Sequence, residues 1–264
     1  MDRADPLTGG MTMRLRQVAL ASRRLDEVAA ELAAVFGLKV AYNDPHIHHY
    51  GLRNAVLPAG TGFLEIVEPV QADASAGRFI DRRGGDAGYM VILQAADAEA
   101  ERARVTGLGV RVVDDLDSGD YRASHFHPAD FGGVLTSIDQ QRSAPDYLEP
   151  YGDWMPAGPD WRDARTADVL DLAAVTISAA DAPALAARWA TLLGTAPSAA
   201  DPLVLPLKHG EIRFESAAAG APTLVAAVTL KVADAAEIRR RARAAGVIGP
   251  DGTIRIGGVR FDIA

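Results

Sequence analysis

The sequence predicts an α+β fold made of four copies of one module, a strand followed by a helix and then by two or three strands. Three segments carry the start of the module: VILQAADAEAERARVTGLGV, VTISAADAPALAARWATLLG and VTLKVADAAEIRRRARAAGV. Each has a β-branched run, an Ala-Asp pair and an alanine-rich stretch. Two closing strands also match, GGVLTSI at 132–138 and GGVRFDI at 257–263. Internal repeats of this kind define the architecture of the chain.

The helix of each copy follows from the same pattern. Asp97, Asp181 and Asp234 stand where a side-chain oxygen can accept a hydrogen bond from a free backbone N–H of the first turn. Near the N-terminus, VALASRRLDEVAAELAAVFGL has the same layout with a weaker cap. Small apolar residues recur at three- and four-residue spacing, which gives each helix one face for packing on a sheet. The copies begin near residues 14, 87, 170 and 224.

Two segments lie outside the modules. Residues 1–12 lack an apolar core and are expected to be a disordered leader. Residues 141–167 are rich in Pro, Asp and Gly, and we expect an ordered connector there because its Trp and Tyr side chains need a surface to cover. The chain is therefore expected to divide into a first domain over 13–140 and a shorter second domain over 168–264.

Composition excludes several classes of function. The 264 residues include no cysteine, which excludes disulfides, thiolate metal sites and a cysteine nucleophile. The net charge of −8 gives an acidic surface that repels phosphate backbones, so nucleic acid is not an expected partner. No apolar run approaches the roughly 18 residues that span a membrane. We expect a cytoplasmic protein with a small-molecule ligand, and a homodimer stays open.

Two motifs in the first half carry a resemblance. His48-x-x-Gly51-x-x-Asn54, followed by Phe-Leu-Glu ending at Glu65, resembles a His-x-x-Gly-Thr-x-Asn and Tyr-Leu-Glu pattern, with Leu52 in place of Thr. HPADFGGVL, at 127–135, resembles a closing strand of epimerase-like proteins. Together with the four modules, these motifs resemble the vicinal oxygen chelate superfamily, which includes glyoxalase I, extradiol dioxygenases, methylmalonyl-CoA epimerase and bleomycin-resistance proteins. The resemblance covers residues 13–264 and implies βαβββ modules paired into two glyoxalase-type domains, each pair curled around a cavity.

The resemblance also implies where a metal would bind, since the first and last strands of each module usually supply His or Gln and Glu. These positions are Gln17, Glu65, Met90 and Ser137 in the first half, and Ala174, Glu215, Ala227 and Asp262 in the second. A Met thioether is soft and a Ser hydroxyl is a weak neutral ligand, so neither half reaches the three ligands of a catalytic zinc site. We predict no cofactor and no stoichiometric metal at these positions. The alternative is a site rebuilt from the histidines at 46, 48, 125 and 127.

Glu65 is the predicted general base. Strand alternation in FLEIV puts Leu64 and Ile66 against a helix and Glu65 into the cavity. A carboxyl group in a partly apolar cavity has a raised pKa, which suits a base. The alternative is a structural salt bridge between Glu65 and an arginine such as Arg53.

The stretch HIHHYGLRN is expected to form a strand, with His46 and His48 on one face and His49 on the other. The predicted function is that of a lyase or isomerase in which His48 and Asn54 hold a substrate oxygen beside the base. The other predicted ligand-binding residues are Gln17, Met90, His127 and Ser137. The alternatives are a non-catalytic binding or sequestering protein of bleomycin-resistance type, and a polar strand with no function.

The second half is expected to be a degenerate partner. Glu215 follows Arg213 by two residues, and Asp262 follows Arg260 by two, so each pair shares one face of a strand. We expect an internal arginine–carboxylate network there, in a half that supports the first.

Overall fold

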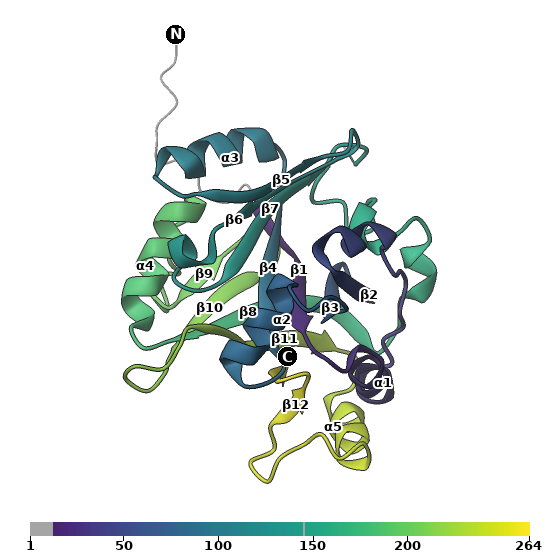
Figure 1. The fold of residues 1–264 in the computed structure, drawn as a ribbon. Coiled ribbons are helices and arrows are strands. Elements are labelled where there is room, and N and C mark those ends of the chain that lie inside the picture. Colours follow the sequence, from purple (N-terminus) through teal and green to yellow (C-terminus); the bar gives the residue numbers. More distant parts are fainter. Residues whose placement is uncertain (1–12, 145) are drawn as a thin grey trace.

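The computed structural model describes residues 13–144 and 146–264 (Figure 1). The predicted leader, residues 1–12, therefore lies outside the described residues. Within them the chain forms thirteen strands and five α-helices, and the α+β class is confirmed. Helices α1, α3, α4 and α5 lie around the outside of the strands in Figure 1.

The first half contains two modules. The first consists of β1 (Met13–Ala21), α1 (Leu25–Phe36), the 3-10 helix η1 (Pro45–Tyr50), β2 (Leu52–Ala59) and β3 (Gly62–Pro69), and a further helix, α2 (Ser75–Arg83), follows it. The second consists of β4 (Ala87–Ala95), α3 (Ala98–Gly107), β5 (Val112–Asp117), β6 (Tyr121–Phe126), η2 (Pro128–Phe131) and β7 (Leu135–Gln141). Helix α2 was missed in the sequence, because it starts after Ala74, which has no side chain that could cap it.

The second half repeats the plan with shorter strands. The third module consists of β8 (Val169–Ala179), α4 (Ala182–Leu193), β9 (Val204–Pro206) and β10 (Glu211–Ser216), and the fourth of β11 (Leu224–Val232), α5 (Ala235–Ala244), β12 (Ile254–Ile256) and β13 (Val259–Ile263). In the described chain, the second module alone has three strands after its helix. Isolated bridges, Tyr42 with Val56 and Ile248 with Ile254, stand where a further strand would lie in the first and fourth modules.

Strand pairing is the same in all four modules. The first strand pairs in parallel with the last: β1 with β3, β4 with β7, β8 with β10 and β11 with β13. Modules then join through antiparallel pairing of their first strands, β1 with β4 and β8 with β11. The modular arrangement predicted from the repeats is thus confirmed.

The predicted helix caps are present. The side chain of Asp97 accepts a hydrogen bond from the backbone N–H of Ala100, at 2.9 Å. Asp181 and Asp234 cap α4 and α5 in the same way. Helix α1 begins after Arg24 without a side-chain cap, in line with its weaker signal. These caps satisfy donors that the first helical turn leaves free.

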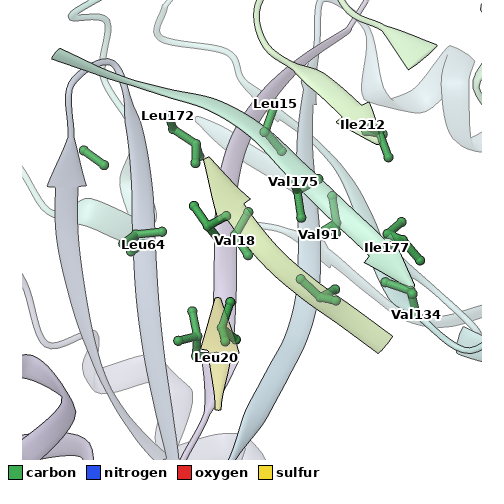
Figure 2. Close-up of a cluster of buried hydrophobic side chains, with 14 of the residues drawn as sticks. Leu15, Val18, Leu20, Leu64, Val91, Val134, Leu172, Val175, Ile177 and Ile212 are labelled. Atoms are coloured by element: carbon green, nitrogen blue, oxygen red, sulfur yellow. The ribbon is translucent and has the colours of Figure 1, made fainter. Parts of the chain in front are cut away.

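The two halves share one hydrophobic core. In Figure 2, strands of the second half cross over those of the first half, whose part of the sheet is called the first sheet below, and Val18 on β1 and Val91 on β4 lie close to Val175 and Ile177 on β8. Strands β4 and β11 join the two halves into one thirteen-stranded sheet through the pair Val225 with Gly88, and an isolated bridge joins Arg14 with His209. A Cβ at that glycine would lie 2.4 Å from the Val225 carbonyl oxygen, so the close approach of the sheets requires a residue without a side chain.

The connector closes one end of the first half. Trp154 and Trp161 are buried against Phe63, with ring centroids 6.4 and 4.9 Å from it. The guanidinium of Arg16 lies 4.9 Å from the Phe63 ring and 5.2 Å from the Trp154 ring, and it donates to the carbonyl of Gly152. We propose domains over 13–140 and 168–264 with a connector over 141–167, since β7 ends at Gln141 and β8 begins at Val169. None of the helices in the described ranges is both long and apolar enough to cross a membrane.

Candidate functional site

A cavity of about 1080 Å³ lies on the face of the first sheet that points away from the shared core. Side chains from β1, β3, β4, β6 and β7 line its inner part, and α2, η1 and Pro222 of the second half line its outer part. Alternation along the strands decides which residues reach it, because successive side chains point to opposite faces. Leu64 and Ile66 face the shared core and Glu65 faces the cavity, as predicted.

Glu65 lies at the centre of the first sheet. It is aligned with Ala19 on β1, and Ala19 is aligned in turn with Met90 on β4. The side chain lines the cavity although the residue is only 7% exposed. Arg53 does not reach it, because Arg53 pairs with Glu68 at 2.5 Å and with Asp26 at 2.8 Å. No other arginine of the described residues forms an ion pair with Glu65, whose partners are Gln17 and Asn54, so the salt-bridge alternative is wrong.

Two side-chain amides hold the Glu65 carboxylate. Gln17 Nε2 donates to one oxygen at 2.8 Å, and Asn54 Nδ2 donates to the other at 2.7 Å. Their orientations are fixed from behind by groups that can only donate. The indole N–H of Trp154 donates to Gln17 Oε1 at 2.8 Å, and the backbone N–H of Asp44 donates to Asn54 Oδ1 at 2.8 Å. Each amide must therefore present its N–H to the carboxylate.

Burial and hydrogen bonding act on the Glu65 carboxyl in opposite directions. Burial raises the pKa of the Glu65 carboxyl above its ordinary range and outweighs the hydrogen bonds from Asn54 and Gln17, which lower it. The geometry of the two amides suits the carboxylate. A protonated Glu65 would have to point its O–H at an amide N–H or into the cavity. The ionised form satisfies both amides and keeps further lone pairs for a ligand, as a general base requires.

A second buried carboxyl group, Asp139, lines the same cavity. The residue is 1% exposed, and Tyr121 donates its phenolic O–H to Asp139 at 2.5 Å. Ser137 bonds to the other oxygen of Asp139, and its hydroxyl also lies 3.2 Å from the Ser124 carbonyl oxygen. The sequence interpretation stopped at Ser137 and missed Asp139, although Leu135, Ser137 and Asp139 share one face of β7 by simple alternation.

The environment of Asp139 differs from that of Glu65. Burial raises the pKa of the Asp139 carboxyl to about 7, while the hydrogen bonds from Ser137 and Tyr121 lower it and the nearby charge of Glu65 raises it. Hydroxyl groups can accept as well as donate. When Asp139 is protonated, Ser137 can donate to the Ser124 carbonyl and accept from the carboxyl. The site therefore accommodates Asp139 in both protonation states.

Comparison with known proteins identifies the family. The model of the glyoxalase-like domain family matches residues 18–193, about two thirds of the chain. The chain belongs to the glyoxalase-like domain family. This confirms the resemblance drawn from the motifs around Asn54 and Glu65.

Solved structures give likenesses of two kinds. A variant of methylmalonyl-CoA epimerase from Streptomyces coelicolor, in complex with 2-nitronate-propionyl-CoA, has 25% sequence identity and a TM-score of 0.45, covering 50% of this chain and 99% of its own. The epimerase from Mycobacterium tuberculosis has 23% identity and a TM-score of 0.44, covering 53% and 92%. A hypothetical protein from Staphylococcus aureus has 14% identity and a TM-score of 0.66, covering 96% and 100%, which supports the fold across both halves. No curated protein matches the chain.

The metal positions implied by the family do not fit a divalent cation. Such an ion needs lone pairs directed at it. Gln17 Oε1 accepts from Trp154 instead, and both Glu65 oxygens accept from amides. Met90 offers a soft thioether. Across 13–144 and 146–264, no group of three or more His, Asp or Glu side chains could hold a metal ion, the histidines included. We derive no chemistry through a metal, and the absence of a stoichiometric metal stays a prediction.

The structure brings most predicted ligand-binding residues together. Gln17, Asn54, Met90 and His127 line the cavity with Glu65. The hydroxyl of Ser137 faces Asp139 and the Ser124 carbonyl, so Ser137 supports the carboxyl from behind.

His48 is not brought to the base, and the strand predicted for HIHHY is wrong. Pro45 and the side chain of Asp44, which accepts from the N–H of His46, start the 3-10 helix η1, and Gly51 ends it in a left-handed conformation. His48 is exposed on that helix and does not line the cavity, whereas His49 does.

The strand predicted to carry both His125 and His127 is also shorter than expected. Strand β6 ends at Phe126, and His127 caps η2 by accepting from the N–H of Ala129. His125 lies 3.7 Å from the carboxylate of Asp114, which also accepts the Tyr50 hydroxyl. These contacts connect η1 to β5 at the outer part of the cavity.

The arginine–carboxylate network of the second half is present in part. Arg260 contacts Glu215 at 2.9 Å and Asp262 at 3.0 Å. Arg213 pairs with Glu211, not with Glu215 as predicted. None of these residues lines the cavity described above.

Proposed function

We propose that the protein catalyses proton transfer at a carbon atom of a small organic molecule bound in the first cavity, as an isomerase or lyase that uses no metal. One observation supports this most strongly. Glu65 and Asp139 are two buried carboxyl groups in one cavity, and their partners differ: amides that can only donate hold Glu65, whereas hydroxyl groups that can donate or accept hold Asp139. Because only Asp139 has partners that also suit its protonated form, we assign Glu65 as the base and Asp139 as the acid.

Glu65 is the proposed base. Its ionised form is held by the amides of Gln17 and Asn54, which fix the carboxylate without neutralising its charge. It would take a proton from a carbon atom next to a carbonyl or carboxylate of the ligand. Positioned acid–base groups of this kind contribute about 10²- to 10⁴-fold to a rate.

Asp139 is the proposed acid. Its pKa of about 7 lets it carry a proton near neutral pH. In an isomerase it would deliver that proton to a second carbon position, and in a lyase to the leaving group. At the end of the step Glu65 is protonated and Asp139 is ionised. Proton exchange with solvent then restores the starting state of both groups.

One observation favours a second function, sequestration of a ligand without chemistry. Phe79 and Tyr89 form an edge-to-face pair, with ring centroids 5.0 Å apart, in the outer part of the cavity, a surface suited to a flat apolar molecule.

A cytoplasmic location and a homodimer are likewise proposals.

Hydrogen exchange at carbon separates the two functions. The protein would be incubated in D₂O with a panel of carbon acids, namely 2-oxo acids, 2-hydroxy ketones and malonyl-type thioesters, and loss of the C–H signal followed by proton NMR. We expect exchange with at least one class, and a loss of at least about 100-fold in Glu65→Gln and Asp139→Asn. Asp262→Asn, in the second half, is the control and should exchange at the unmodified rate. Binding without exchange would support sequestration, and exchange at full rate in both cavity variants would refute the proposal.

A further inference from the structure

Two arginines at the end of α2 line the outer part of the cavity. Arg82 and Arg83 are the only Lys or Arg residues among the described residues that line it, while five carboxyl groups line the remainder. An anion inside the cavity is therefore repelled everywhere except at this end. The chain as a whole has a net charge of −8, so an uncompensated pair of cations is unusual in it.

Neither arginine has a carboxylate partner. No ion pair or hydrogen bond of the Arg82 side chain occurs within the described chain. Arg83 donates to the carbonyl of Thr223 and lies 5.2 Å from the Phe79 ring, and its Nη1 is buried with no partner among the described residues. The nearby acids are already paired, Asp81 with Arg23 and Asp86 with Arg24.

The positive charges of Arg82 and Arg83 repel each other. Burial lowers the pKa of Arg83, and the charge of Arg82 lowers it further. A guanidinium presents several N–H groups in a plane and matches the two oxygens of a carboxylate or phosphate. An oxyanion between Arg82 and Arg83 would relieve their repulsion and satisfy the buried Nη1.

Tyr89 connects this end of the cavity to the proposed base. It neighbours Met90 on β4 and lines the same cavity. After burial, the charge of Glu65 is the largest influence that raises the pKa of Tyr89, and the charges of Arg78 and Arg82 act in the opposite direction. Tyr89 is therefore within electrostatic reach of both Glu65 and Arg82.

We infer that Arg82 and Arg83 form an oxyanion subsite, and that the ligand has a carboxylate or phosphate group at one end and an apolar body that packs on Phe79 and Tyr89. The subsite orients the ligand, because its anionic end is repelled by the charge of Glu65 and its other end is left beside Glu65 and Asp139. Only this last step, the position of the reacting end, rests on the proposed function.

Binding of simple probes tests the subsite without a known substrate. Phenyl phosphate, phenylacetate and the neutral phenylacetamide would be titrated at low ionic strength and followed by NMR shifts. We expect the double variant Arg82→Gln with Arg83→Gln to raise the Kd of at least one anionic probe 10-fold or more, and that of phenylacetamide less than 2-fold. The two anionic probes decide between phosphate and carboxylate.

A matched control removes the same charge elsewhere. Arg239 and Arg243 are exposed on α5, away from the cavity, so changing both to Gln should leave every Kd within 2-fold. Equal weakening in the two double variants, or none in either, would overturn the inference. Because Arg83 also bonds to Thr223, Arg82→Gln alone is included as a variant with no contact to lose, and it should weaken anionic probes by at least 3-fold.

The base variant separates this inference from the proposed function. Glu65→Gln should bind the anionic probes at least as tightly as the unmodified protein, since it removes a negative charge from the cavity. Binding of the anionic probes without C–H exchange would support the subsite and refute the proton-transfer function. C–H exchange without any dependence of the probe Kd on Arg82 and Arg83 would support the proton-transfer function and refute the subsite.

Discussion

Carboxyl groups on the last strands of the modules have opposite surroundings in the two halves of the molecule. In the first half, Glu65 is 7% exposed and is held by neutral amides. In the second half, the side chains of Glu215 and Asp262 are 36% and 38% exposed, and both contact Arg260. An arginine neutralises a carboxylate and removes it as a base, whereas an amide positions it and leaves its charge available. The comparison indicates that the first half leaves the charge of a buried carboxyl group without a cationic partner, while the second half uses the carboxyl groups of the equivalent strands in a structural contact.

The largest expected effect comes from removing the charge in the first half. Glu65→Gln should reduce any C–H exchange by about 10²- to 10⁴-fold, because an amide cannot accept the proton. It should also lower the free energy of unfolding by about 1–3 kcal/mol, since the new NH₂ group faces an amide donor of Gln17 or Asn54. Urea denaturation and exchange rates measure the two effects. If Glu65→Gln exchanged C–H hydrogen at the unmodified rate, the contrast between the two halves would fail, since Glu65 would then be no more reactive than Glu215.

The second effect concerns Asp139 and pH. The folded protein keeps the Asp139 proton up to about pH 7, while the carboxyl of an unfolded chain loses it near 3.8. Between these values the folded state binds more protons, so this group makes the free energy of unfolding fall as pH rises from about 4 to about 7. The full difference corresponds to about 4 kcal/mol as an upper bound.

Asp139→Asn isolates this contribution, because it keeps the hydroxyl contacts and removes the titration. Urea unfolding at pH 5 and pH 8 should show a clearly smaller loss of stability in Asp139→Asn than in the unmodified protein. C–H exchange in the unmodified protein should decline on the alkaline side of pH 7. Identical stability profiles for the two proteins would mean that Asp139 does not hold its proton in the folded state.

The third effect concerns the connector. Trp154 and Trp161 are both buried beside Phe63, but only the indole N–H of Trp154 has a partner, Gln17; that of Trp161 has none within the described chain. Trp154→Phe leaves Gln17 Oε1 without its donor, which costs about 1–3 kcal/mol and frees the amide to rotate. We expect a decrease of about 10-fold in exchange for Trp154→Phe.

Trp161→Phe is the matched control, because it changes the ring in the same way without removing a hydrogen bond. It should lose stability through packing alone and leave exchange within about 2-fold. If both variants lost exchange equally, packing of the connector, and not the orientation of Gln17, would be the cause.

The fold and part of the site could be predicted because their signals are local. The caps at Asp97 and Asp181 and the alternation around Glu65 depend on neighbours within four residues. The 3-10 helix that carries His48 could also have been predicted, since Pro45 follows an aspartate, as is common at the start of a helix. The family pattern of histidine and glycine was given more weight than that signal, which placed His48 on a strand.

Other parts of the site depend on contacts between distant residues. Trp154 and Gln17 are 137 positions apart, and only the folded chain shows that a connector side chain fixes the amide of a strand residue. Arg83 and Thr223 are 140 positions apart and join α2 to the second half. Asp139 is the exception, because it continues the cavity-facing row of Leu135 and Ser137 and could have been found by alternation.

The smallest expected effect is in the second half, and it tests the comparison from the other side. Changing Glu215 to Gln and Asp262 to Asn leaves Arg260 without a carboxylate partner. All three side chains are partly exposed, so water and salt screen the pair, and exposed ion pairs contribute about 0–1 kcal/mol. We therefore expect the free energy of unfolding to fall by less than about 1 kcal/mol, with even less effect at high salt, and C–H exchange to stay within about 2-fold. A loss of exchange comparable to that of Glu65→Gln would show that the second half carries chemistry of its own, and the division between a reactive and a structural copy would fail.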